Sequence, residues 1–251
     1  MTIKKEKKDE ITTIIIDNPE VRNAIDGQSA YELYRAFKSF ENDKDSKVAI
    51  LCGSDRNFCS GANLKALVNG TGNKVEEDGY GPMGPTRMNL TKPVIAAIAG
   101  YAVAGGLELA LWCDIRIVEK NTIFGVFNRR WGIPLIDGGT IRLPRIIGQG
   151  RALDMILTGR EVNAEEAYVM GLANYIVENG QSRIEAEKLA KKIAKFPQLC
   201  LQHDRLSTYE QFGLSTKRAL ENEFEHGLIS LSEVKEGLYR FTAGEGRHGH
   251  F

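Results

Sequence analysis

The stretch Gly100-Tyr-Ala-Val-Ala-Gly-Gly-Leu-Glu-Leu-Ala-Leu-Trp-Cys-Asp114 carries the clearest structural signal in this chain. The apolar run Val94–Ala99 precedes it and is typical of a buried strand. A glycine pair, Gly105 and Gly106, then opens an apolar helical run that holds one carboxylate, Glu108. Backbone N–H groups at a helix start lack intrahelical partners and lie at the positive end of the helix dipole. The turn can therefore hold an oxyanion, although a glycine pair also suits an ordinary tight strand-to-helix turn.

A second turn of the same kind lies upstream. Cys59-Ser-Gly-Ala-Asn-Leu-Lys65 follows the predicted strand Lys47–Cys52 and places small residues where a short helix is expected to begin. Two such turns, each after a buried strand, could direct two N–H groups at one carbonyl oxygen, which would stabilise an enolate or a tetrahedral oxyanion. Neither nucleotide-binding glycine fingerprint, GxGxxG or GxxxxGK, occurs in the chain.

Composition narrows the functional classes. The 251 residues carry 33 basic and 33 acidic side chains, so no global field attracts nucleic acid or a membrane, although a local basic patch stays open. The basic run Lys4–Lys8 is interpreted as a solvated N-terminal face. No apolar segment has the length of a membrane span, and no signal peptide is recognised. We expect no nucleic-acid or membrane partner.

The cysteines and histidines give no sign of a metal site or of disulfides. The four cysteines form no CxxC pair and are predicted to be buried thiols in a reducing compartment, hence a cytoplasmic protein; they are Cys52, Cys59, Cys113 and Cys200. No HExxH or similar spacing occurs, so no metal ligands are expected.

Alternating strand and helix patterns, followed by a helical tail, predict an α/β fold. Strands are expected over 11–17, 47–52, 94–99 and 115–118. Helices are expected over 28–40, 107–112, 139–147, 150–157, 164–170, 182–195, 208–230 and 232–241, and a short helix is expected to open within 60–65. Residues 69–87 have no clear period and are predicted to form a mobile loop, either a lid or a surface excursion.

These motifs resemble the crotonase superfamily, the enoyl-CoA hydratase/isomerase family. The matching segments are Asn18–Ala24, Phe58–Lys65, Lys92–Ala110, Cys113-Asp114, Phe124-Gly125, Gly138–Leu143, Leu157–Arg160 and Gly171–Ala173. The resemblance implies a spiral of ββα units with the acyl-CoA site in a core of residues 1–195. It also implies a helical C-terminal trimerisation region of residues 196–251, in a homotrimer or a dimer of trimers.

The same resemblance implies a coenzyme A thioester as substrate, with no tightly bound cofactor. The oxyanion hole would be formed by the N–H groups of Ser60 and Gly105. Arg22 and Ala24 would lie near the coenzyme A, with Arg22 a candidate phosphate partner or merely a surface charge. The segment beside the adenine and pantetheine arm would comprise Ser60, Gly61, Ala62, Asn63, Leu64 and Lys65. Asn63 stands where the family often has aspartate, a departure expected to affect helix capping more than chemistry.

Family hydratases use two glutamates, one to activate water and one to deliver a proton to the α-carbon. Glu108 fills the first position, with stabilisation of its own helix as the alternative role. Asn128 stands at the second position and cannot exchange a proton near neutral pH. Asp137 could reach the same cavity, or could serve as the N-cap of the helix beginning near Gly138.

Three neighbours of Asn128 have open roles. Arg129 and Arg130 could hold a substrate carboxylate or pair with structural acids. Trp131 could line the acyl pocket or lie in the core.

The leading hypothesis is an acyl-CoA lyase or isomerase that forms a thioester enolate. Glu108 would be the acid/base, assisted by Asp137. Isomerisation fits a single carboxylate better than hydration does, and hydration stays open if Asn128 positions the water. The alternatives are an acyl-CoA hydrolase or decarboxylase on the same scaffold and a non-catalytic acyl-CoA binder. A serine hydrolase fits less well, because no serine lies beside Gly105 and no histidine has a supporting motif.

Overall fold

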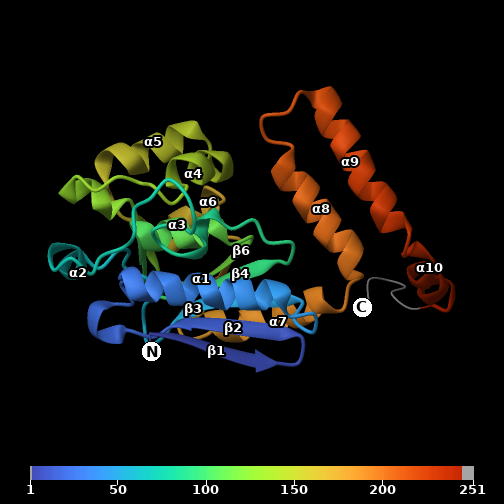
Figure 1. The fold of residues 1–251 in the computed structure, drawn as a ribbon, viewed down its shortest axis with the longest axis horizontal. Helices are drawn as coiled ribbons and strands as arrows, with labels where there is room; N and C mark the ends of the chain where they lie inside the picture. Colours follow the sequence, from blue (N-terminus) through green and yellow to red (C-terminus); the bar gives the residue numbers. More distant parts are fainter. Residues whose placement is uncertain (1, 245–251) are drawn as a thin grey trace.

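A computed structural model describes residues 2–244. Its main sheet has six strands in the order β1-β2-β3-β4-β6-β9 (Figure 1). The strands are β1 (Ile3–Lys8), β2 (Ile11–Ile16), β3 (Val48–Gly53), β4 (Val94–Ile98), β6 (Ile115–Glu119) and β9 (Tyr175–Val177). Only β1 is antiparallel to its neighbour, and the other pairs are parallel. Parallel strands need crossover connections, and helices supply most of them.

A second sheet gives the chain its spiral course. It consists of β5 (Tyr101–Val103), β7 (Ile123–Gly125) and β8 (Val162–Asn163), in the order β5-β7-β8. Consecutive strands β4, β5, β6 and β7 therefore alternate between the two sheets, and α3 (Gly105–Trp112) follows the β4–β5 pair. This alternation is the predicted ββα spiral, and the α/β fold class is confirmed.

Helices cover both faces of the main sheet. On one face, α1 (Gly27–Asn42) buries Leu33, Phe37 and Phe40 in the larger core cluster. On the other face, α7 (Ser182–Ala194) buries Ala186, Ala190 and Ile193 against the second cluster. Figure 1 shows α1 and α7 on opposite sides of β1–β4, with α3 between α1 and α4 (Gly139–Ile147). The helix that holds Glu108 is thus at the centre of the molecule.

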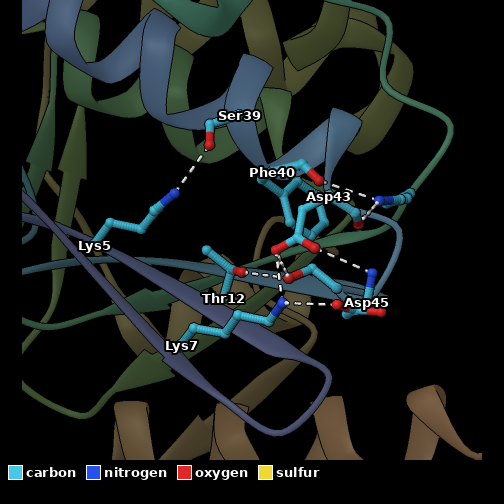
Figure 2. A network of polar contacts seen from close by, with 9 residues as sticks. Lys5, Lys7, Thr12, Ser39, Phe40, Asp43 and Asp45 are labelled. Atoms are coloured by element: carbon cyan, nitrogen blue, oxygen red, sulfur yellow. Dashed lines mark hydrogen bonds and ion pairs between the residues drawn. The ribbon is translucent and has the colours of Figure 1, made fainter.

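The N-terminal basic run forms a strand that the sequence did not predict. In β1 only Ile3 is buried, which confirms the expected solvated face. The extended conformation of the basic run was not expected. Its lysines pair with the end of α1: Lys5 Nζ donates to Ser39 Oγ at 2.9 Å, and Lys7 Nζ lies 2.8 Å from Asp43 (Figure 2). The Lys7 hydrogen bond is the main cause that lowers the pKa of Asp43 to about 2.

The C-terminal helices differ from the expected ones. The structure has α8 (Gln198–Glu210), α9 (Thr216–Leu231) and α10 (Val234–Thr242). A single helix over 208–230 was therefore wrong, because Gly213 has a φ of +87° and Ser215 caps a new helix by accepting from the N–H of Arg218. In Figure 1, α8 and α9 form a hairpin beside the core. Residues 245–251 of the predicted C-terminal region lie outside the described residues.

The short helix expected to open within residues 60–65 is α2 (Leu64–Val68), with Asn63 as its N-cap. Two smaller expectations are corrected. Within 69–87, the segment Gly81–Thr86 is entirely buried, so this part is neither a lid nor a surface excursion. Cys52, Cys59 and Cys113 are buried as predicted, but Cys200 is exposed. The remaining helices are α5 (Gln149–Thr158) and α6 (Ala164–Val169).

Within residues 2–244, no helix is long and apolar enough to cross a membrane. No group of three or more histidine, cysteine, aspartate or glutamate side chains in that range could hold a metal ion.

Candidate active site

Backbone pairing brings the two glycine-containing turns together. Cys59 forms a parallel bridge with Ala102, so the segment after β3 runs beside the strand that leads into α3. Gly61 has a φ of +97°, and a Cβ there would lie 3.0 Å from the N atom of Gly105. A Cβ at Gly106 would lie 2.0 Å from the carbonyl oxygen of Cys59. Only glycine allows these backbones to approach so closely.

The two turns present unpaired N–H groups. Gly105 is the first residue of α3, and its N–H precedes the first intrahelical bond, from Glu108 N to Ala104 O. Ala104 has a φ of +53°, a left-handed conformation that is costly for a residue with a Cβ. In the other turn, the bridge between Ile25 and Ala62 uses the N–H groups of residues 25 and 63, and the Ala62 N–H has no partner among the described residues.

Ser60 is not the oxyanion donor that the sequence indicated. Its N–H donates to the carbonyl oxygen of Arg22 at 3.1 Å, and its hydroxyl donates to Val21 O at 3.1 Å. Ala62, two residues later, has the free N–H. The prediction for Ser60 is therefore wrong as to the donor, while Gly105 keeps its free N–H.

Glu108 is a buried residue of the apolar helix α3, but its carboxylate accepts hydrogen bonds from the start of a different helix, α4. Its side chain is 3% exposed, and Oε1 accepts from the N–H groups of Asp137 at 2.9 Å and Gly139 at 2.8 Å. Gly139 is the first residue of α4, so the carboxylate lies at the positive end of that helix rather than stabilising its own. Burial and the charge of Asp137 nevertheless raise the pKa of Glu108 to about 7.

Asp137 is a second buried carboxylate beside the first. It is 4% exposed, and its Oδ1 accepts from Met83 N at 2.9 Å and from the Thr86 hydroxyl. It does not cap α4: the N-cap is Gly138, which makes no side-chain cap hydrogen bond. Desolvation raises the pKa of Asp137, so both carboxyl groups favour a protonated form more than they do in water.

Arg142 stabilises the backbone that positions this carboxylate pair. Its guanidinium donates to the backbone carbonyl oxygens of Asp137 at 2.9 Å and Thr86 at 2.7 Å. Burial lowers the pKa of Arg142, yet its charge still favours the ionised forms of Glu108 and Asp137. The guanidinium ties the segment Gly81–Thr86 to the start of α4.

Asn128 is 6% exposed and lies in the short helix η3 (Phe127–Trp131). Its Nδ2 donates to Ile133 O at 2.8 Å, and its Oδ1 has no partner. The side chain is held in place but cannot exchange a proton at neutral pH.

A cavity of about 550 Å³ joins these groups. The predicted site residues that line it are Arg22, Ser60, Ala62, Leu64, Gly105, Glu108, Asn128, Trp131 and Asp137. Four others do not line it: Ala24, Gly61, Asn63 and Lys65. Arg22 is exposed at its edge, with the guanidinium carbon 5.4 Å from the centre of the Tyr101 ring.

The three side chains after Asn128 have defined positions. Arg129 Nε donates to Ile156 O at 3.1 Å, and Arg130 Nη2 donates to Gly159 O at 2.9 Å. Within residues 2–244 neither arginine forms an ion pair with a structural acid, the role that the sequence favoured. Trp131 lines the cavity and is 72% exposed, which excludes a place in the core.

Comparison with known proteins agrees with this geometry. A family model described as enoyl-CoA hydratase/isomerase matches residues 6–251. The chain is 32% identical over 243 residues to a crotonyl-CoA hydratase of Syntrophomonas wolfei, covering 94% of this chain and 93% of that protein. It is 36% identical over 250 residues to an (E)-benzylidenesuccinyl-CoA hydratase of Thauera aromatica, covering 96% and 92%. The chain belongs to the enoyl-CoA hydratase/isomerase family.

Solved structures give the same family, the crotonase superfamily. The crystal structure of an enoyl-CoA hydratase from Mycobacterium tuberculosis superimposes with a TM-score of 0.91 at 32% identity, covering 97% of this chain and 96% of that one. The protein is thus an acyl-CoA-processing enzyme of the hydratase/isomerase type.

Several cavity residues of this family member were not found from its sequence. They are Asn73, Val75, Met83, Tyr101, Phe127, Ile133 and Pro134. The only available signal was the Gly-Pro-Met-Gly-Pro pattern at residues 81–85, which occurs inside a segment predicted to be a mobile loop. Prolines restrict the backbone, so such a pattern also suits a fixed wall.

Proposed function

We propose that the enzyme catalyses the reversible hydration of a 2-enoyl-CoA thioester. The supporting observation is that one cavity is lined by Ala62 and Gly105, whose N–H groups have no partner among residues 2–244, and by two buried acidic residues, Glu108 and Asp137. The N–H groups would bind the thioester carbonyl oxygen and stabilise the enolate that forms on it. Water would be added across the double bond next to that carbonyl.

The carboxylate pair would supply both proton transfers. Because burial and the charge of Asp137 raise the pKa of Glu108 to about 7, Glu108 is partly protonated near neutral pH, and the pair would offer both a proton acceptor and a proton donor. The acceptor would take a proton from water as its oxygen bonds to the β-carbon and the electrons move to the thioester oxygen. The enolate would then collapse as the α-carbon takes a proton from the pair.

Asn128 would orient the water without exchanging a proton. Its Oδ1 has no partner among residues 2–244 and almost no accessible surface, and a small shift of the side chain toward the cavity would let it accept a hydrogen bond from one water O–H while Nδ2 stays bound to Ile133 O. This arrangement leaves the second O–H for the carboxylate pair.

We also propose that substrate binding and assembly follow the family pattern. Arg22, Leu64 and Trp131 line the cavity and would contact the coenzyme A ester. Residues 196–251 would form the trimer contact.

The direct test is incubation of the purified protein with crotonyl-CoA, recording loss of the conjugated thioester absorbance and formation of 3-hydroxybutyryl-CoA. The proposal requires turnover, with oxygen from labelled water in the product. No turnover across a series of 2-enoyl-CoA lengths would contradict it.

The variant A62P tests the oxyanion donor, because proline has no backbone N–H. We expect kcat to fall about a hundredfold to a thousandfold, the usual effect of losing one oxyanion donor. The matched variant A62G keeps the N–H and should stay within a few-fold of the parent. Equal activity of A62P and A62G would contradict the assignment of Ala62.

Isomerisation is the second candidate, favoured by the side-chain amide of Asn128, which cannot exchange a proton near neutral pH. Glu108 would remove a proton from the α-carbon of a 3-enoyl-CoA and return it to the γ-carbon. Formation of conjugated 2-enoyl-CoA from 3-enoyl-CoA, with no hydration of crotonyl-CoA, would select this candidate over the first.

A further inference from the structure

A second cavity, of about 350 Å³, lies at the carboxyl ends of the parallel strands. Within the described part of the chain, it shares no lining residue with the candidate active site. Helix α7 begins in its wall, at Ser182. Its floor is formed by side chains on the α7 face of four neighbouring strands: Ile15 of β2, Cys52 of β3, Ala97 of β4 and Glu119 of β6. Open α/β sheets commonly bind ligands at this end of their strands.

Glu119 is the charged residue of this floor, and only one of its two carboxylate oxygens has a partner. The residue is 5% exposed, and Oε1 accepts from the Ser182 hydroxyl at 2.8 Å and from the Ser182 N–H at 3.3 Å. Oε1 thus binds the first residue of α7, which is a structural role. Oε2 has no partner among residues 2–244, yet it is not one of the four unpartnered oxygens in that range that lack accessible surface. Because Glu119 lines the cavity, Oε2 can accept a hydrogen bond from a ligand there.

The charges around the cavity favour a cation as that ligand. Four acidic side chains line it, against two basic ones. Each basic side chain already has an acidic partner from the lining, in the ion pairs Lys4–Asp17 and Arg183–Glu6. The other two lining acids, Glu119 and Asp55, form no ion pair within residues 2–244. An anionic ligand would therefore have to displace an existing pair, whereas a cation would meet unpaired carboxylates.

The remaining floor limits the kind of cation. Ile15 and Ala97 are apolar, so an aliphatic group can lie against them. No group of three or more histidine, cysteine, aspartate or glutamate side chains in residues 2–244 could hold a metal ion, which argues for an organic cation. A volume of about 350 Å³ is in the range of small-molecule sites.

We propose that this cavity binds a small aliphatic primary amine in its ammonium form, which donates an N–H to Glu119 Oε2. The alkyl chain would lie on Ile15 and Ala97, and the charge of Asp55 would add attraction. The site is separate from the acyl-CoA cavity, so this inference goes beyond the proposed function and does not depend on it.

The test is a ligand-observed NMR titration at pH 7 and constant ionic strength, with n-butylammonium chloride and with n-butanol as the neutral probe of similar shape. We expect the parent protein to bind butylammonium about tenfold to a hundredfold more tightly than butanol. The variant E119Q keeps an oxygen that can accept from Ser182 but replaces Oε2 by an amide nitrogen, so it should lose this preference. The matched variant E178Q removes an exposed acid outside the cavity and should keep it.

The parent protein alone can overturn the proposal. If neither probe binds, or if both bind equally, the cavity holds only water. If E119Q keeps the preference, or if E178Q also loses it, butylammonium binds elsewhere or through general charge attraction, and the proposal is wrong. A thermal unfolding temperature of E119Q equal to that of the parent shows that lost preference is not lost folding. None of these results bears on crotonyl-CoA turnover, which tests the proposed function separately.

Discussion

The two walls of the cavity are built in different ways. One wall is regular: β5 leads directly into α3, which presents the Gly105 N–H and the Glu108 carboxylate from consecutive turns. The opposite wall is irregular, and η3, the loop to Asp137 and the segment Gly81–Thr86 are held by hydrogen bonds between residues distant in sequence. Local sequence therefore positions the first wall, and long-range contacts position the second.

The difference matters most for the carboxyl groups. The regular wall presents Glu108, and the irregular wall presents Asp137, whose N–H donates to Glu108 Oε1 at 2.9 Å. Asn128, which by family resemblance stands where hydratases have a second glutamate, also lines the irregular wall. In the proposed mechanism the acid/base pair would therefore be shared between the walls.

Replacement of Glu108 by glutamine gives the largest expected effect. Glutamine can still accept the N–H groups of Asp137 and Gly139 through its oxygen, but it has no exchangeable carboxyl proton. We expect kcat for enoyl-CoA hydration to fall about a thousandfold to ten-thousandfold with binding retained. Steady-state kinetics and binding of a saturated acyl-CoA measure the two separately. A near-normal kcat in E108Q would mean that Glu108, and with it the regular wall, does not carry the proton transfer.

E108Q should also be more stable than the parent protein at alkaline pH. Because the folded-state pKa of Glu108 is raised from 4.5 to about 7, the folded protein binds this proton more tightly than the unfolded chain does. Parent stability therefore falls as pH rises between those two values, by on the order of 3 kcal/mol. E108Q should lack this decrease. Denaturant unfolding of both proteins at pH 4.5 and pH 8 checks it, and parallel pH profiles would contradict it.

Part of the regular wall could be predicted from the sequence. Apolar periodicity, the glycine pair and the earlier strand β4 placed α3 and Glu108 correctly, because these signals are local. The short strands β5, β7, β8 and β9 were not predicted, and neither was β1, whose lysines and glutamate form a strand only by pairing with β2. The sequence also predicted one helix over 208–230, because the helical composition on both sides outweighed the turn signal of Gly213 between α8 and α9.

The irregular wall could be predicted only in part. An aspartate before two glycines at a helix start is a capping signal, yet Asp137 binds Met83 and Thr86, more than 50 residues away. Likewise, the family resemblance implied Ser60 as the oxyanion donor, and the sequence alone could not tell which N–H is free. The bridge between Ile25 and Ala62 decides that, and it is a long-range contact.

Removal of the Asp137 charge tests whether the walls share the acid/base pair. In D137N the side-chain oxygen can still accept from Met83 N, but repulsion with Glu108 is gone. We expect kcat to fall about a hundredfold. The pKa of Glu108, read from the pH dependence of kcat/KM, should move to lower pH. A fall in kcat with no movement of that pKa would make Asp137 independent of Glu108.

The smallest effect is expected at Asn128, and it separates water positioning from proton transfer. N128L has a similar volume but no acceptor, so the water loses one hydrogen bond while Glu108 and Asp137 keep theirs. Hydration should slow about tenfold, the kinetic equivalent of about 1 kcal/mol, with the pH profile unchanged. Isomerisation of a 3-enoyl-CoA, which needs no water, should be unaffected. Equal losses in both reactions would mean that Asn128 only supports the fold of η3, through its bond to Ile133.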